Sequence, residues 1–206
     1  SVVVVEKGSE AGAHILSGAV IDPIGLDRLL PDWREDAARP LKTQVTEDRM
    51  YVLGPAGGVR LPQRLMPPLM SNHGCFVGSL ANVARYLAAR AEALGVEIYP
   101  GFAATELLFV ATGDMGVSRD GEAKDSFTRG MELVGKYTLL AEGARGSLSK
   151  QAIARYRLDE GRDPQKYAIG VKEIWDIDPA LHKQGLVQHS MGWPLDNRTG
   201  GGSFIY

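Results

Sequence analysis

The chain opens on an uninterrupted run of valines, residues 2–5, and this run constrains the fold more than any other stretch. Valine is stiff at χ1 and suits an extended strand better than a helix. A strand that is apolar at consecutive positions has no polar face, which is typical of a parallel sheet covered by helices on both sides. The run therefore predicts a buried parallel strand and an α/β fold.

An acidic residue, Glu6, ends this run and is followed by Lys7 and Gly8. In dinucleotide-binding folds, the acid at the carboxyl end of the second strand accepts the ribose hydroxyls of an adenine nucleotide. A glycine-rich phosphate loop stands about twenty residues ahead of that acid. This sequence contains no such loop ahead of Glu6. The pattern predicts a flavoprotein-like fold without its first βα unit.

Composition narrows the class of protein. The 206 residues, 44% of them hydrophobic, suffice for one substantial core, either in one compact piece or in parts of two interleaved domains. A net charge of −2 gives no basic footprint for nucleic acid, so we expect no nucleic-acid partner. No apolar run approaches the roughly 18 residues that a membrane-spanning helix needs.

Metal centres are not expected on this chain. Its one cysteine, Cys75, cannot by itself form a disulfide, a four-cysteine zinc site or an iron–sulfur cluster. The histidines show no metal-ligand spacing. We assign His14 and His73 to the flavin region or to a role in fixing loops, and His182 and His189 to the surface. The tryptophans are expected to be core anchors, namely Trp33, Trp175 and Trp193.

Hydrophobic periodicity predicts the order of the elements. The best helix covers residues 77–94, where apolar residues recur at helical spacing and Gly95 supplies the stop. Asp120-Gly121 marks the turn of a hairpin over residues 113–125. The other expectations are a short helix over 22–33, extended or loop structure over 34–52, strands at 96–99, 105–110 and 136–141, and short strands alternating with turns from residue 167 onward.

Residues 138–146 carry the strongest local motif. An apolar strand ends in Glu142 and Gly143, and Gly146 opens a helix. Glycines let backbone N–H groups approach a pyrophosphate or a flavin edge, and a helix N-terminus favours anionic phosphates. An ordinary strand, turn and helix with a glycine cap explains the motif equally well by itself. Its combination with Glu6 favours cofactor binding.

A second candidate is the stretch over residues 59–70, which is apolar, rich in proline and too short to span a membrane. Arg60 and Arg64 stand between leucine and methionine residues, as in a segment that lies at a lipid interface. The alternative is a buried proline-rich loop.

Several motifs, taken in order, resemble the electron transfer flavoprotein–ubiquinone oxidoreductase family, and the resemblance covers nearly the whole chain as an internal fragment. They are Gly12-Ala13-His14, Leu16-Ser17-Gly18-Ala19, Pro31-Asp32-Trp33, Val45-Thr46-Glu47-Asp48-Arg49, Asn72-His73-Gly74, residues 95–101, Met115-Gly116-Val117, Ala141-Glu142-Gly143, Gly192-Trp193-Pro194-Leu195-Asp196 and Gly201-Gly202-Ser203-Phe204.

The resemblance implies a glutathione-reductase-like FAD/NAD(P)-binding fold interleaved with part of an α+β ubiquinone-binding domain. Residues 1–58 and 75–155 would belong to the FAD domain, and residues 156–206 would begin the ubiquinone-binding domain. Residues 59–74 would face the membrane, with contacts from Leu61, Leu65, Met66, Leu69 and Met70.

Site residues follow from the same resemblance. Cofactor binding would fall to Glu6, Lys7, Gly8, Ser17, Gly18, Ala103, Ala104 and Gly143. Ubiquinone would meet the backbone of Gly201 and Gly202, since bare backbone can bond a quinone carbonyl in a narrow site. The alternative for this glycine run is a bulge or tight turn. We expect no catalytic acid or base, because the cofactors of the family carry the chemistry.

The activity that the resemblance implies is electron transfer from reduced electron transfer flavoprotein, through FAD and a 4Fe–4S cluster, to ubiquinone. Such an enzyme would be a peripheral protein of the bacterial cytoplasmic membrane or the mitochondrial inner membrane. The cysteine ligands of the cluster are absent from this chain. The alternatives are a folded fragment without activity and a flavoprotein related to geranylgeranyl reductases.

Two departures from the family pattern stand out. Gly200 occupies a position where the family often has tyrosine. Residues 107–109, Leu-Leu-Phe, lead directly into Val110 in the sequence, at a place where the family usually has a polar turn between two strands.

Overall fold

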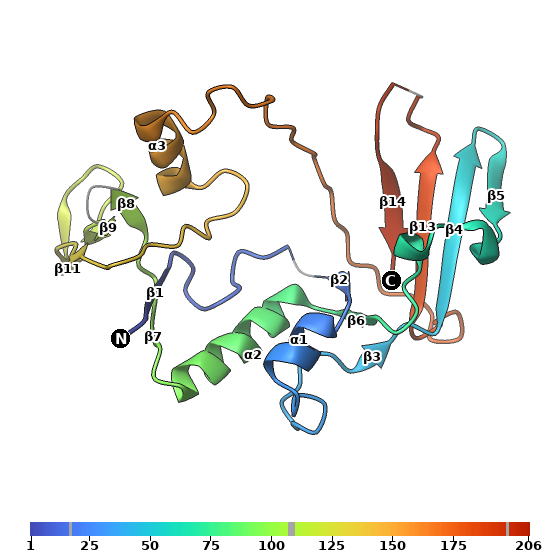
Figure 1. Cartoon of the computed structure of the whole chain (residues 1–206), viewed down its shortest axis with the longest axis horizontal. Coiled ribbons are helices and arrows are strands. Elements are labelled where there is room, and N and C mark those ends of the chain that lie inside the picture. The colour runs from blue at the N-terminus through green and yellow to red at the C-terminus, as the bar shows by residue number, and fades with distance from the viewer. Residues whose placement is uncertain (17, 107–109, 197) are drawn as a thin grey trace. The chain divides into compact units, whose positions relative to one another are not determined.

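The computed structural model describes residues 1–16, 18–106, 110–196 and 198–206. Ser17 and the departure at residues 107–109 lie outside this described part. The chain divides into two units. The first unit contains residues 1–13 and 88–172, and the second contains residues 14–87 and 173–206. Figure 1 shows the elements in order.

The first unit begins with a parallel pair of strands. β1 (Val3–Glu6) pairs with β7 (Glu97–Pro100) in the register Val3↔Glu97 to Glu6↔Pro100. The expected parallel pairing is therefore present. The expected burial of the opening strand is wrong, because Val2, Val3 and Val4 are exposed. Within the described residues β1 has only β7 beside it, and a two-stranded sheet leaves its apolar faces open.

The long helix leads into β7. α2 (Leu80–Ala93) starts three residues later than predicted, because residues 76–78 form strand β6 and the hydroxyl of Ser79 accepts a hydrogen bond from the N–H of Asn82. At its other end the helix stops as expected, and Gly95 has φ +86°. The N–H of Val96 donates to the carbonyl of Ala91 and closes the last turn.

Short antiparallel strands follow in the first unit. β8 (Ala104–Glu106), β9 (Val110–Thr112) and β12 (Glu132–Leu133) form one sheet in the order β12-β9-β8. The single strand predicted at 105–110 is thus two strands, whose connection lies outside the described residues. β10 (Met115–Val117) and β11 (Ala123–Thr128) form the predicted hairpin, and Gly121 at its turn has φ +88°.

The strand predicted at residues 136–141 is wrong. These residues have no regular structure, and Tyr137 is 93% exposed. A strand exists only where its backbone finds a partner, and none among the described residues pairs with this stretch. The predicted helix after it is present as α3 (Ser147–Tyr156).

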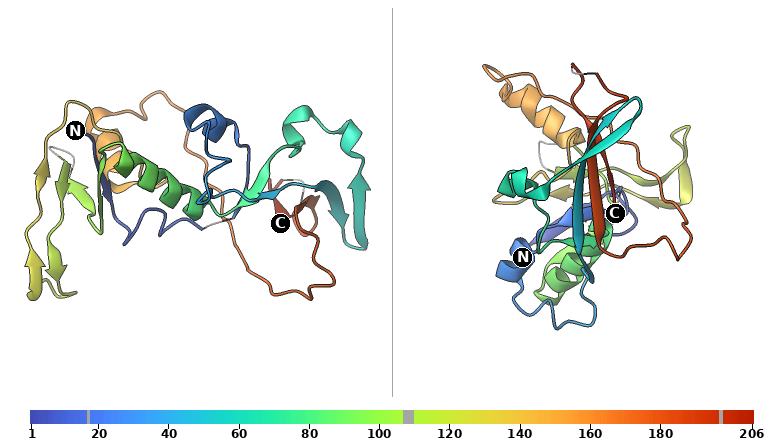
Figure 2. Two further views of the ribbon diagram at one scale, coloured as in Figure 1. Left: turned by 90° about the horizontal axis from the view of Figure 1, so that it is seen from below. Right: turned by 90° about the vertical axis from the view of Figure 1, so that its right-hand side faces the viewer.

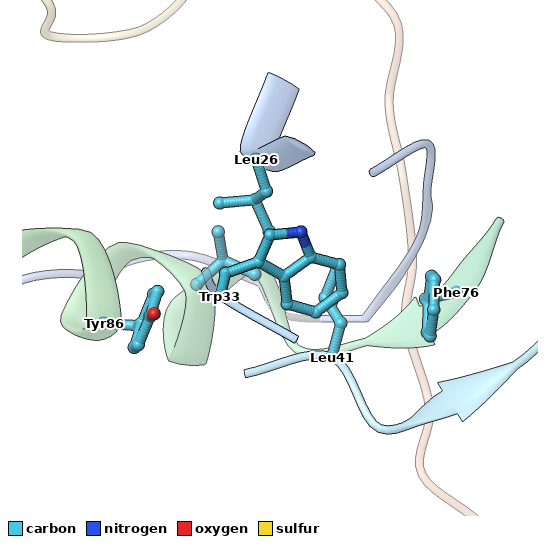
Figure 3. Packing of buried hydrophobic residues seen from close by; sticks show 6 residues of the cluster. Leu26, Trp33, Leu41, Phe76 and Tyr86 are labelled. Carbon is cyan, nitrogen blue, oxygen red and sulfur yellow. The ribbon is translucent and has the colours of Figure 1, made fainter. Parts of the chain in front are cut away.

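The second unit contains the hydrophobic core. The predicted short helix is α1 (Ile24–Leu29), and β2 (Ala19–Ile21), β6 (Phe76–Gly78) and β3 (Thr43–Gln44) form a sheet in the order β2-β6-β3. Trp33 is 1% exposed, and its indole N–H donates to Oδ1 of Asp27 at 2.7 Å. Figure 3 shows it among Leu26, Leu41, Phe76 and Tyr86. Val83 also belongs to this cluster.

A four-stranded mixed sheet completes the second unit. Its order is β14 (Gly202–Ile205), β13 (Leu186–Gly192), β4 (Glu47–Gly54) and β5 (Gly57–Leu61), with β13 parallel to β4 and the outer pairs antiparallel. Figure 2 shows these strands from two further directions. After β5 come two 3₁₀ turns, η1 (Gln63–Leu65) and η2 (Pro68–Met70).

The remaining expectation for the end of the chain is only partly met. Residues 167–185 contain turns but no strand, because the alternating apolar residues there find no backbone partner among the described residues. Trp175 and Trp193 are exposed rather than buried, so of the three predicted aromatic anchors only Trp33 lies in the core.

Candidate functional site

The predicted nucleotide end lies where β1 stops. Oε1 of Glu6 accepts a hydrogen bond of 2.6 Å from the N–H of Gly8. This shapes a tight turn at the carboxyl end of a parallel strand, the place where α/β folds bind their ligands. A Cβ on Gly8 would lie 2.9 Å from Cβ of Ala13, so the turn requires glycine for packing. Lys7 is exposed beside it.

The predicted adenine-side residues lie next to this turn. The N–H of Gly101 donates to the carbonyl of Gly8 at 2.7 Å, and the N–H of Phe102 donates to that of Glu6 at 3.0 Å. Ala103 follows directly, and its carbonyl accepts from Gly113 at 3.0 Å. The first unit therefore brings Glu6, Lys7, Gly8, Ala103 and Ala104 to one end of the β1–β7 pair.

The motif at residues 142–146 is built around its acid. The carboxylate of Glu142 accepts hydrogen bonds from the N–H of Leu148 at 3.1 Å and of Ser149 at 2.8 Å, so it caps the N-terminus of α3. Burial acts to raise the pKa of Glu142, but these N–H donors outweigh it and lower the pKa below its ordinary value. Gly143, with φ +80° and open space at its Cβ position, makes the turn before the cap.

The residues predicted to bind the cofactor belong to different units. Gly18 has φ +96° and belongs to the second unit, whereas Glu6 and Gly143 belong to the first. Ser17 is outside the described residues. The cofactor roles of all these residues stay predictions.

The glycine pair predicted for ubiquinone lies at the start of β14. Gly202 pairs with Met191, and a Cβ on Gly202 would collide with the carbonyl oxygen of Ser190. Close pairing of β13 and β14 therefore already requires glycine there. A Cβ on Gly201 would meet only Cδ1 of Leu195, at 2.8 Å, and one on Gly200 would meet nothing within 4 Å. Gly201 is thus the member of the pair whose glycine the packing of the strands does not require.

The predicted membrane-facing residues form an exposed loop. We call residues 61–70, the end of β5 with η1 and η2, the apolar segment. Leu69 is 99% exposed, Leu65 and Met70 are also exposed, and Leu61 and Met66 are half-buried. The alternative of a buried proline-rich loop is therefore wrong. No helix among the described residues is long and apolar enough to cross a membrane.

A polar cluster beneath the apolar segment was missed by the sequence analysis. Oδ2 of Asp48 accepts hydrogen bonds from the Nδ2 of Asn72 at 3.0 Å and the Nε2 of Gln63 at 3.2 Å. The Nδ2 of Asn72 also lies 3.3 Å from Nε2 of His189, which is half-buried rather than at the surface as predicted. One signal was present in the sequence, since Asp48 alternates with Met50 and Val52 on a strand face that is otherwise apolar.

The opposite face of β4 carries a separate ion-pair cluster. Glu47 accepts from Nε and Nη2 of Arg49 at 2.7 and 2.6 Å and from Nη2 of Arg60 at 3.1 Å. These guanidinium hydrogen bonds, Arg49 first, lower the pKa of Glu47 to about 2. Among the described residues no group of three or more His, Cys, Asp or Glu side chains could hold a metal ion.

The chain is similar to known proteins over its whole length. The family model described as "ETF-QO, ubiquinone-binding" matches residues 167–206. The electron transfer flavoprotein-ubiquinone oxidoreductase of Pseudomonas aeruginosa is 55% identical over the whole chain, which covers 39% of that relative. The alignment extends over 216 residues, against 206 in this chain, so the relative has residues with no counterpart in this sequence.

Eukaryotic relatives match over the whole chain as well. The mitochondrial electron transfer flavoprotein-ubiquinone oxidoreductases of Dictyostelium discoideum and Bos taurus are 49% and 47% identical, and the chain covers 34% of each. The chain thus spans little more than a third of the length of these relatives. By this similarity the chain belongs to the electron transfer flavoprotein–ubiquinone oxidoreductase family.

Proposed function

We propose that this chain is part of an oxidoreductase that passes electrons from reduced electron transfer flavoprotein to ubiquinone at a membrane surface. The observation that carries the proposal is the 55% identity between this chain, over its whole length, and the electron transfer flavoprotein-ubiquinone oxidoreductase of Pseudomonas aeruginosa. The match of residues 167–206 to a ubiquinone-binding family supports the acceptor. FAD and a 4Fe–4S cluster are the redox groups that we propose for the whole protein.

The turn after β1 fits the adenosine end of FAD. Its carboxylate, Glu6, stands at the carboxyl end of a parallel strand, and Gly8 keeps the turn free of a side chain. FAD would supply the one- and two-electron chemistry. Glu6 would accept the ribose hydroxyls, with Lys7, Gly8, Ala103 and Ala104 around them. We place Ser17, Gly18 and Gly143 nearer the flavin, in a glutathione-reductase-like fold whose first βα unit is not part of this sequence.

The residues of this chain do not fit the cluster. A 4Fe–4S centre takes four thiolates, and the chain has the single thiol of Cys75. Burial, followed by the charges of Asp22 and Asp48, raises the pKa of that thiol and keeps it protonated. The proposed cluster therefore depends on cysteines other than those of residues 1–206.

The quinone is proposed to meet the backbone at Gly201 and Gly202. Gly202 is bound into the β13–β14 pairing, whereas the pairing does not require glycine at Gly201, and this supports Gly201 as the proposed contact of a bare backbone with the ligand. A peptide N–H or carbonyl in that place can bond a quinone oxygen without a side chain in the way. The apolar segment would rest at the lipid interface, on the bacterial cytoplasmic membrane or the mitochondrial inner membrane.

Steady-state kinetics of the full-length holoenzyme with a short-chain ubiquinone tests this proposal. Gly201→Ala is expected to raise the KM for ubiquinone about fivefold, which corresponds to the loss of roughly one hydrogen bond. Gly200→Ala is the matched control, because its Cβ meets nothing within 4 Å. Equal KM values for the two variants would refute the quinone contact. Absence of quinone reduction by the wild-type holoenzyme would refute the function itself.

A further inference from the structure

A polar cluster around the carboxylate of Asp48 helps to hold the apolar segment onto the four-stranded sheet. Oδ2 of Asp48 accepts from the side chain of Gln63, from the side chain of Asn72 and, at 2.9 Å, from the backbone N–H of Asn72. Nε2 of Gln63 also lies 3.5 Å from the carbonyl oxygen of Met70, across the loop. Asp48 therefore fastens both the beginning and the end of the loop that carries the exposed Leu65 and Leu69.

The same carboxylate fixes how the amide of Asn72 is turned. If the amide were rotated by 180°, its oxygen would face the negative oxygen of Asp48, so the NH₂ group must point toward Asp48. That NH₂ group also faces Nε2 of His189, 3.3 Å away. A donor on Asn72 requires an acceptor on His189, and Nε2 is an acceptor only when it carries no proton.

We propose that Asp48, Asn72 and His189 form a proton-operated latch for the apolar segment. Protonation of His189 places an N–H at Nε2, where it faces the N–H of the Asn72 side chain. Rotation of the amide would relieve this donor–donor contact, but it would also turn the amide oxygen toward the carboxylate of Asp48. The link between β13 and Asn72 then opens, and residues 63–72 loosen on the sheet. This inference rests on the proposed membrane contact, because a loosened segment binds a lipid surface more weakly.

The residues paired with His189 across the sheet are uncharged. Its cross-strand neighbours are Met50 on β4 and Phe204 on β14, neither of which titrates. The carboxylate of Asp48 is linked to His189 through the side-chain amide of Asn72. The pKa of the Cys75 thiol is raised by burial and, after that, by the charges of Asp22 and Asp48. Glu47 and Arg49 stand on either side of Asp48 along β4, and Arg60 pairs with Tyr51. These three charges therefore face the other side of the sheet. His73 is a second imidazole, exposed next to Asn72, so it needs a control.

Hydrogen–deuterium exchange of residues 63–72 tests the latch in the full-length protein at about pH 8 and about pH 5.5, on either side of the usual imidazole transition. His189→Gln places an amide oxygen near the position of Nε2 and cannot be protonated. We expect wild type and His189→Gln to be protected alike at the higher pH. At the lower pH the wild-type segment should exchange about three- to tenfold faster than the variant, the equivalent of one hydrogen bond. His73→Gln should behave as wild type.

Equal exchange in wild type and His189→Gln at the lower pH would overturn the latch. Asn72→Ala removes the link altogether and is expected to exchange fast at both pH values, so wild-type protection in this variant would also overturn it. Nitrogen NMR of the imidazole at the higher pH gives a readout that needs no substitution. A proton on Nδ1 is expected there, and a proton on Nε2 would contradict the inferred arrangement.

Vesicles of zwitterionic phosphatidylcholine separate the latch from the membrane contact, because their charge does not change over this pH range. Wild type is expected to bind them several-fold more weakly at the lower pH, and His189→Gln equally at both. Failure of the wild type to bind at the higher pH would refute the proposed membrane contact, while the exchange data would still decide the latch. Binding without pH dependence, in a wild type whose exchange does respond, would refute the effect of the latch on the membrane.

Discussion

At the scale of single residues, glycines and carboxylates position the candidate sites. Gly8 and Gly202 stand where a Cβ would collide with a neighbour, so their glycines follow from packing whether or not a ligand binds. The sequence singled out both positions, but it could not separate packing from binding, because the atoms that a Cβ would meet belong to Ala13 and Ser190, which are not chain neighbours of these glycines. Asp48 and His189 were missed because they are linked only through Asn72, which lies 117 residues from His189 along the chain.

Glu6 provides a prediction for the cofactor. Glu6→Gln keeps an oxygen for the N–H of Gly8 but removes the charge that strengthens a bond to a ribose hydroxyl. We expect the Kd for FAD of the full-length apoprotein to rise about tenfold. Glu97→Gln, on the paired strand β7 but at its amino end, is the control and should leave the Kd unchanged. An unchanged Kd in Glu6→Gln would remove Glu6 from the site.

Glu47 provides a prediction for pH. The pKa of Glu47 is lowered from 4.5 to about 2, chiefly by the hydrogen bonds of Arg49. A carboxyl whose pKa is lower in the folded state stabilises the fold above its unfolded pKa, and this stabilisation is lost as the pH falls through the folded pKa. The contribution of Glu47 is thus complete above about pH 4.5 and disappears between there and about pH 2.

Urea unfolding over that window measures this contribution. The free energy of unfolding of wild type should fall more steeply with decreasing pH than that of Glu47→Gln, which has no carboxyl to protonate. Glu132→Gln, an exposed carboxyl of β12 in the first unit, is the control and should retain the wild-type slope. A wild-type slope in Glu47→Gln would show that the ion pairs with Arg49 and Arg60 do not contribute to stability.

At the scale of elements, local signals were sufficient where the element supports itself. Helix α2 has its own periodicity and its own stop at Gly95, and the hairpin of β10 and β11 has its own turn at Gly121. Strands that depend on a distant partner were less predictable. Residues 136–141 have the composition of a strand, yet no strand forms without backbone pairing.

The apolar segment provides a prediction at this scale. Leu65→Asp together with Leu69→Asp places two charges on its most exposed side chains and should abolish binding of the full-length protein to phosphatidylcholine vesicles. Neither side chain is packed in the core, so the melting temperature should stay close to wild type. Leu139→Asp is the matched control, because Leu139 is equally exposed but lies in the first unit. Vesicle binding that survives the double substitution would exclude this loop as the lipid contact.

At the scale of the whole molecule, the two units interleave along the chain. Residues 1–13 join residues 88–172, and residues 14–87 join residues 173–206. The sequence predicted the mixed α/β character and left open whether the chain forms one compact piece or parts of two interleaved domains. It could not give the boundaries, because the division falls inside helix α2, where hydrophobic periodicity continues without a break. The assignment of residues 1–58, 59–74, 75–155 and 156–206 to FAD, membrane and ubiquinone portions stays a prediction.

The proposed function is tested by the reoxidation of reduced electron transfer flavoprotein in the presence of the purified full-length protein and ubiquinone. Visible absorption first establishes that the preparation contains flavin. We expect rapid reoxidation that requires both the protein and the quinone. A flavin-containing preparation that leaves the electron transfer flavoprotein reduced in the presence of ubiquinone would contradict it.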